Sequence, residues 1–156
     1  MCGFFSSNNI ENIKVAKERL LWGFWHKEIG EKQKRNWGFF NKLYHKINPF
    51  DSVIFQYKDT GEIHALGVVK RKYYDDETLV WPEELSERKV LFPWRVEFCF
   101  MLFSTEPFIT YFLKTENYVE GYGIGEVPEF EFRLVFENIK KRFELAKLEF
   151  NIGITI

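Results

Sequence analysis

The chain has 156 residues and a mass of 18.9 kDa, a length that suits one domain and leaves no room for two. Its apolar share of 46% and charged share of 29% exclude a long disordered or collagen-like chain. The net charge of -1 excludes nucleic-acid binding through bulk positive charge, so any such binding must be local. The aromatic share of 19% is unusual, and some of these rings exceed what a core needs.

The N-terminal half of the chain alternates between helical patterns and short apolar segments. Asn8 and Glu11 have the spacing of a capping box, which predicts the start of the first helix. A turn at Gly61 joins two apolar segments and predicts a hairpin. In chain order the expected elements are a strand at 2–5, a helix at 9–19, a basic helix within 26–46, and strands at 51–57 and 63–72.

The C-terminal half continues with a polar loop, a buried strand and an amphipathic helix. We expect a loop with one helical turn at 73–89, a strand at 94–103, a glycine-rich loop at 117–125 and a helix at 128–147, whose first half also fits a strand. The sum is α+β, with five or six strands and three or four helices; a small twisted β-barrel flanked by helices is the compact arrangement. One domain is expected over 1–147, with 148–156 a tail or the start of a linker.

Signatures of targeting, metal binding and catalysis are missing from the sequence. The N-terminus has no signal peptide, and no uncharged stretch approaches the length of a membrane span. Cys2 and Cys99 cannot form a disulfide framework or a zinc site by themselves, and His26, His45 and His64 lack the spacing of a metalloprotease motif. We therefore expect a cytoplasmic, non-catalytic protein that binds no metal, cofactor or membrane.

One N-terminal motif resembles a known family. The segment FFSSNNIENIKVAK at residues 4–17, followed by Trp22, resembles the opening of the YTH domain, a reader of N6-methyladenine. In that family the last Asn of a Ser-Asn-Asn-x-Glu-Asn stretch precedes a cage tryptophan by ten positions, which is the spacing between Asn12 and Trp22. The resemblance covers about residues 2–103 and places Trp81 at the second cage tryptophan. Trp22-Gly23 and the PWRV segment at 93–96 also resemble EVE domains and the N-terminal domains of McrB-type restriction proteins.

The resemblance implies a PUA-like fold of the YTH or EVE type and an aromatic cage for an extruded or single-stranded N6-methyladenine. Trp22 and Trp81 would sandwich the purine above Leu91, since indole faces stack on bases. The Asn12 amide would donate to ring nitrogen one, and a backbone carbonyl near Gly23 would accept the remaining N–H. The expected base-binding residues are Ser7, Asn8, Asn12, Trp22, Gly23, Trp81 and Leu91.

Local positive charge supplies the electrostatics that the neutral total lacks. The segment from His26 to Lys46 contains six basic and two acidic residues, which gives it a local charge of +4. A second basic cluster lies at 70–72. These segments flank the expected cage in the sequence, so they are candidates for contacts with phosphates. The expected backbone-binding residues are Lys27, Lys32, Lys34, Arg35, Lys70 and Arg71.

The sequence leaves several alternatives open. Asn8 and Asn12 also suit helix caps, Trp22 suits a core position, and Trp25 and Trp94 compete with Trp81 for the second cage position. Our functional prediction is the DNA-targeting domain of a McrBC-type, modification-dependent restriction system, with further domains or subunits as partners. The alternatives are an EVE-like reader of 5-methylcytosine, a reader of N6-methyladenine in RNA, a nucleic-acid hydrolase that uses a histidine and paired carboxylates, and a protein-interaction module.

Overall fold

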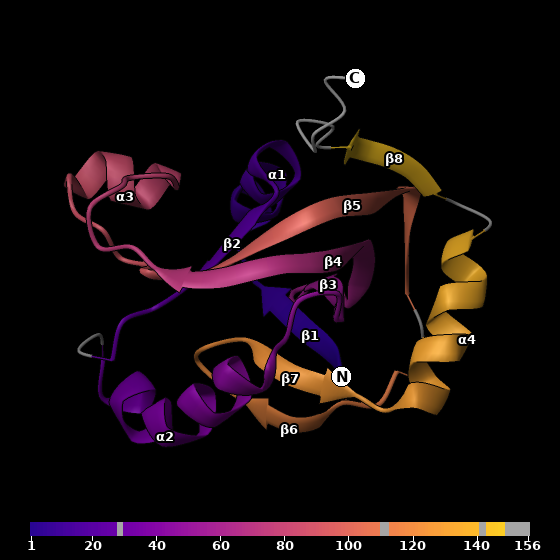
Figure 1. Cartoon of the computed structure of the whole chain (residues 1–156), viewed down its shortest axis with the longest axis horizontal. Coiled ribbons are helices and arrows are strands. Elements are labelled where there is room, and N and C mark those ends of the chain that lie inside the picture. Colours follow the sequence, from indigo (N-terminus) through magenta and orange to yellow (C-terminus); the bar gives the residue numbers. More distant parts are fainter. Residues whose placement is uncertain (28–29, 110–112, 141–142, 149–156) are drawn as a thin grey trace.

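One mixed β-sheet organises the chain, and helices pack on both of its faces (Figure 1). The computed structural model describes residues 1–27, 30–109, 113–140 and 143–148. The helices are α1 (Ile10–Arg19), α2 (Glu31–Lys46), α3 (Pro82–Glu87) and α4 (Glu129–Lys140). The strands are β1 (Cys2–Ser7), β2 (Leu21–Phe24), β3 (Ser52–Tyr57), β4 (Glu62–Tyr74), β5 (Trp94–Ile109), β6 (Glu116–Val119), β7 (Ile124–Val127) and β8 (Phe143–Leu148). The predicted α+β class is confirmed, and the four described helices agree with the three or four expected, but the eight described strands exceed the five or six predicted.

The strands follow the order β2-β5-β4-β3-β1-β7-β6, with β8 paired to β5. Among the described strands only β1 and β3 run parallel, because the chain between them crosses over through α1, β2 and α2; the other described pairs are antiparallel. The edge of β5 that faces away from β4 holds β2 at residues 94–97 and β8 at residues 100–104. Within the described residues this order has two ends, so the sheet is open.

The two faces of the sheet bury different clusters, as the alternation of side chains along a strand requires. Phe5 and Phe55 belong to the large cluster that includes buried residues of α1 and α2. Their strand neighbours Phe4 and Ile54 belong to a second cluster, which Val135 of α4 joins. The core therefore has two layers of apolar side chains, one on each face of the central strands.

Two segments near the C-terminus differ from the prediction. The helix expected at 128–147 ends at Lys140, and residues 143–148 form β8, because β2 leaves most of the long edge of β5 available for pairing. The segment expected to be a loop at 117–125 contains the β6–β7 hairpin instead. Gly121 and Gly123 adopt positive φ, and both lie in the turn between the two strands. The expected tail begins inside β8 with Leu148, and its residues 149–156 lie outside the described part of the chain. Among the described helices, none has the length and apolar character needed to cross a membrane.

Candidate functional site

A cavity of about 400 Å³ opens where the ends of several elements meet, a volume within the range of small-molecule sites. Six of the seven base-binding residues expected from the sequence line it, together with Lys32. They are Ser7, Asn8, Asn12, Trp22, Gly23 and Trp81. The remaining one, Leu91, lies in the buried cluster of Trp81, and its neighbour Phe92 lines the cavity. Residues from β1, α1, β2 and the α3 segment thus converge on one site.

The start of α1 explains why two asparagines face this cavity. Asn9 is the N-cap: its Oδ1 accepts the N–H of Glu11 at 3.0 Å, and its own N–H donates to Ser7 Oγ at 3.0 Å. The capping role predicted for Asn8 is therefore wrong, because the cap lies one residue later. Asn8 is left exposed at the cavity, and Asn12 lies in the first turn of α1.

Two buried polar groups in the cavity lining have no hydrogen-bond partner within the described part of the chain. The side chain of Asn12 is only 8% exposed, and its Oδ1 is unpaired among the described residues. The hydroxyl of Tyr122, in the β6–β7 turn, is also buried and unpaired there. Burial raises the pKa of Tyr122 to about 12, so the phenol is neutral near pH 7. An unpaired buried polar group costs about 1–3 kcal/mol, which a ligand that pairs with it recovers.

Three indoles line the cavity and differ in exposure. Trp22 and Trp81 are only 5% and 1% exposed, whereas Trp25 is half-buried and its ring centroid lies 4.4 Å from that of Phe92. Trp81 lies directly against the backbone of Gly23, where a Cβ would approach a Trp81 ring carbon to 2.6 Å. Gly23 is required for this close approach.

The remaining candidate tryptophan lies elsewhere. The ring of Trp94 contacts Trp37 and Tyr74, at centroid distances of 5.2 and 4.8 Å, and it is not among the described residues that line the cavity. Of the two alternatives that the sequence left open for the second cage position, the structure brings only Trp25 to this site.

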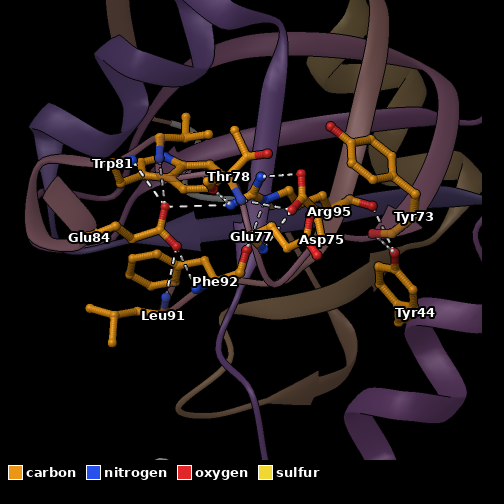
Figure 2. Close-up of polar contacts among 11 residues, drawn as sticks. Tyr44, Tyr73, Asp75, Glu77, Thr78, Trp81, Glu84, Leu91, Phe92 and Arg95 are labelled. Atoms are coloured by element: carbon orange, nitrogen blue, oxygen red, sulfur yellow. Dashed lines mark hydrogen bonds and ion pairs between the residues drawn. The ribbon is translucent and has the colours of Figure 1, made fainter. Parts of the chain in front are cut away.

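The α3 segment that carries Trp81 is fixed by a buried carboxylate. Glu84 is fully buried, and each of its oxygens accepts two backbone N–H groups (Figure 2). Oε1 accepts from Val80 and Trp81 at 2.9 and 3.2 Å, and Oε2 from Leu91 and Phe92 at 2.8 and 3.0 Å. Arg95, also buried, places Nη2 3.6 Å from Glu84 and donates from Nη1 to Asp75 at 3.0 Å. These bonds join both ends of the segment and hold Trp81 and Phe92 at the cavity.

The basic residues expected to bind phosphates are dispersed. Lys32 lines the cavity mouth, with Nζ 2.6 Å from Glu120 Oε1. Lys70 and Arg71 both form ion pairs with Glu97 on β5 and lie outside the described lining. The others are exposed and lie outside it as well: Lys27, Lys34 and Arg35.

The sequence did not indicate the part of the site that the β6–β7 turn provides. Ser6 donates its N–H to Gly123 O at 2.9 Å, and a Cβ on Gly123 would lie 2.3 Å from Ser6 O. Gly123 thereby presses the turn against β1 and brings Tyr118, Glu120 and Tyr122 to the cavity. The run of alternating glycines was the available signal, because a positive φ at Gly123 requires that residue.

The site presents aromatic faces, amide groups and a neutral phenol, which suit a flat ligand with a polar edge. Among the described residues, no group of three or more His, Cys, Asp or Glu side chains could hold a metal ion.

The comparisons with known proteins identify one relative. MJ1369, an uncharacterized protein of Methanocaldococcus jannaschii, is 46% identical to this chain over 145 residues, which are 93% of the chain and 94% of MJ1369. The chain belongs to the MJ1369 family. No family model matches it. Since the alignment spans nearly the whole of both chains, the elements that build the cavity are expected in MJ1369 as well.

Proposed function

We propose that this chain is a non-catalytic reader of N6-methyladenine in nucleic acid, with a PUA-like fold of the YTH or EVE type. The observation that carries the proposal is the unpaired Oδ1 of Asn12, buried in the lining of the same cavity as Trp22 and Trp81. An extruded or single-stranded base enters this cavity. Pairing with a ligand explains why a buried amide oxygen is left without a partner among the described residues.

The edge of N6-methyladenine complements the polar groups of the site. Its ring nitrogen one accepts a hydrogen bond, and its methylated amine keeps one N–H to donate. The amide of Asn12 offers both a donor and an acceptor, and the Tyr122 hydroxyl offers a second polar contact. Stacking on aromatic side chains contributes about 1–3 kcal/mol per base.

The preference for the methyl group is expected to be moderate. Burying one methyl contributes about 1 kcal/mol, and up to about 3 kcal/mol where the pocket rejects the smaller base, so discrimination of about ten- to a hundredfold is expected. In a duplex the base must also leave the stack, at a cost of a few kcal/mol. We propose methylated DNA as the ligand and a DNA-targeting role in a McrBC-type restriction system, with further domains or subunits as partners.

Fluorescence polarisation with matched DNA and RNA oligonucleotides tests this function. The oligonucleotides carry adenine, N6-methyladenine, cytosine or 5-methylcytosine at one position. Tightest binding to N6-methyladenine in DNA is the expected result. Equal binding of methylated and plain adenine contradicts the proposal, tighter binding of 5-methylcytosine supports the cytosine reader, and preference for RNA supports the RNA reader.

Asn12→Ala supplies the variant for this assay, because Trp22 also packs on Phe55 and its removal risks unfolding. The variant is expected to bind both the methylated and the plain adenine oligonucleotide more weakly, because both bases present the edge with which Asn12 pairs. Asn138→Ala is the matched control, since Asn138 is an exposed residue of α4 that bonds only locally to Leu134 O at 3.2 Å. The control should bind as the wild type does.

A further inference from the structure

Three charged side chains from separate elements meet at the mouth of the cavity. Lys32 comes from α2, Lys58 follows β3, and Glu120 belongs to the β6–β7 turn; all three line the cavity. Lys32 and Glu120 are about half exposed, at 49% and 59%. Glu83 of α3 also lines the cavity, so the described lining carries two cations and two anions, of which Lys32, Lys58 and Glu120 are exposed.

Glu120 is fixed to α2 at two points. Its Oε1 lies 2.6 Å from Lys32 Nζ, and its backbone oxygen accepts from Asn36 Nδ2 at 2.7 Å, one helical turn beyond Lys32. Lys32, and to a smaller degree Lys58, hold the pKa of Glu120 below its usual range, so the carboxylate stays charged near pH 7. Lys58 is held beside β1 because its N–H donates to Ser7 O at 2.7 Å.

An exposed carboxylate that is paired with an ammonium group is readily replaced by another anion, because exposed ion pairs are weak. A phosphodiester carries the same single charge and binds lysine through the same kind of contact. A base that enters the cavity brings its own flanking phosphates to the mouth. Glu120 and these phosphates then compete for Lys32.

We propose that Lys32 and Lys58 form a phosphate-binding subsite at the mouth, and that Glu120 occupies it until the phosphodiester beside the bound base displaces it. The inference rests on the proposed function and deepens it, since it names the group that recognises the nucleic-acid backbone. Glu120 is thus a built-in competitor that weakens binding and makes it depend on a well-placed phosphate.

The variant Glu120→Gln tests the competition, because it removes the competing charge and keeps the size of the side chain. The probes are N6-methyladenosine, its 5′-monophosphate, and short single-stranded DNA with and without the methyl group. Glu120→Gln is expected to tighten the phosphate-bearing probes by about two- to fivefold, the size of one exposed ion pair, and to leave the nucleoside unchanged. It should also steepen the logarithmic salt dependence of DNA binding by up to about 0.7.

Two matched controls separate a local exchange from a general change of charge. Glu116→Gln removes one exposed carboxylate from β6, outside the described lining, and should leave every affinity unchanged. Lys32→Gln should weaken the binding of the phosphate-bearing probes. In the double variant, Glu120→Gln should change the affinity much less than it does in the wild type, since the two side chains act on one interaction. Lys14→Gln, which removes an exposed lysine of α1 outside the described lining, should have little effect.

The outcomes distinguish this inference from the proposed function. Tighter binding of phosphate-bearing probes by Glu120→Gln without any methyl preference contradicts the reader function alone and keeps the subsite. A methyl preference with equal affinities of Glu120→Gln and wild type overturns the subsite alone. Equal gains in Glu116→Gln and Glu120→Gln also overturn it, and failure of the wild type to bind any probe overturns both.

Discussion

The cavity has two walls that handle buried polar groups in opposite ways. In the α3 wall, residues 75–95, both oxygens of Glu84 are saturated by backbone N–H groups and Arg95 is bound on several sides. In the other wall, which the start of α1 and the β6–β7 turn form and which is called here the open wall, Asn12 Oδ1 and the Tyr122 hydroxyl are buried without a partner among the described residues.

This difference distinguishes buried polar groups that stabilise one conformation from buried polar groups that pair with a ligand. A saturated buried network fixes its segment in one conformation, because any distortion breaks several bonds at once. An unpaired buried group costs free energy in the empty site and is retained where a ligand pairs with it. Substitutions in the α3 wall should therefore act on stability, and those in the open wall on binding.

Glu84→Gln is expected to have the largest effect on stability. Gln has one acceptor oxygen in place of two, so two backbone N–H groups lose their partner and the charge beside Arg95 disappears. Breaking a buried pair in this way costs about 3–5 kcal/mol of unfolding free energy. Urea unfolding followed by circular dichroism measures it. Glu83→Gln is the control, because Glu83 is half-exposed and bonds Asn9 Nδ2 at 3.3 Å; equal losses in both variants contradict the role assigned to Glu84.

Gly23→Ala should disturb the α3 wall less. The new Cβ would lie 2.6 Å from a rigid ring carbon of Trp81 and 2.8 Å from Phe92 Cβ, so the wall must shift. Overpacking of this kind costs about 1–3 kcal/mol and should also weaken ligand binding. Gly38→Ala in α2 is the matched control, since a Cβ there meets nothing within 4 Å. It should stabilise the protein by about 0.5–1 kcal/mol in the same unfolding assay; a similar loss in both variants would contradict the close approach of Trp81.

The α1 part of the open wall and Trp81 of the α3 wall were predicted from the sequence, whereas the β6–β7 turn and the buried network of Glu84 were not. Asn8, Asn12 and Trp22 lie within one short segment, so their spacing along β1, α1 and β2 carries the information. Nothing local distinguishes Glu84 from Glu83, because its role depends on backbone groups of residues 91 and 92 that return to it after α3. The class of the fold followed from local patterns in the same way.

The errors in the prediction of the fold have one physical origin. β8 and the β6–β7 hairpin exist because strands elsewhere offer an edge for pairing, and a local pattern does not contain that edge. The same limit applies to Lys58 and Glu120, which reach the cavity only through the sheet and the turn at Gly123. The sequence therefore predicted site residues that share one motif, and it missed residues that only the tertiary fold brings to the cavity.

Asn12→Leu is expected to change the unfolding free energy by less than about 1 kcal/mol, because it removes a buried acceptor that has no partner. Binding of the methylated oligonucleotide should fall by tenfold or more. Asn9→Ala is the contrasting variant: it removes the N-cap of α1 and should cost about 1 kcal/mol of stability. Thermal unfolding and fluorescence polarisation on the same samples check both. A large loss of stability in Asn12→Leu would show that Asn12 stabilises the fold as Glu84 does, and it would contradict the difference proposed between the two walls.

The smallest expected effect is a dependence on acid in the α3 wall. Partial burial raises the pKa of Asp75, but N–H donors from Glu77 and Thr78 together with Arg95 outweigh it and hold the pKa below its usual range. The pKa of this carboxyl is near 3.8 in the unfolded chain and lower in the folded protein. As the pH falls, the unfolded state therefore binds the proton first, and the stability that Asp75 contributes is lost as the pH passes from 3.8 down through the folded pKa. The difference in unfolding free energy between wild type and Asp75→Asn should therefore be largest near neutral pH and shrink below about pH 3.8. Urea titrations across that range measure this convergence, and a constant difference for Asp75→Asn would remove Asp75 from the network that fixes this wall.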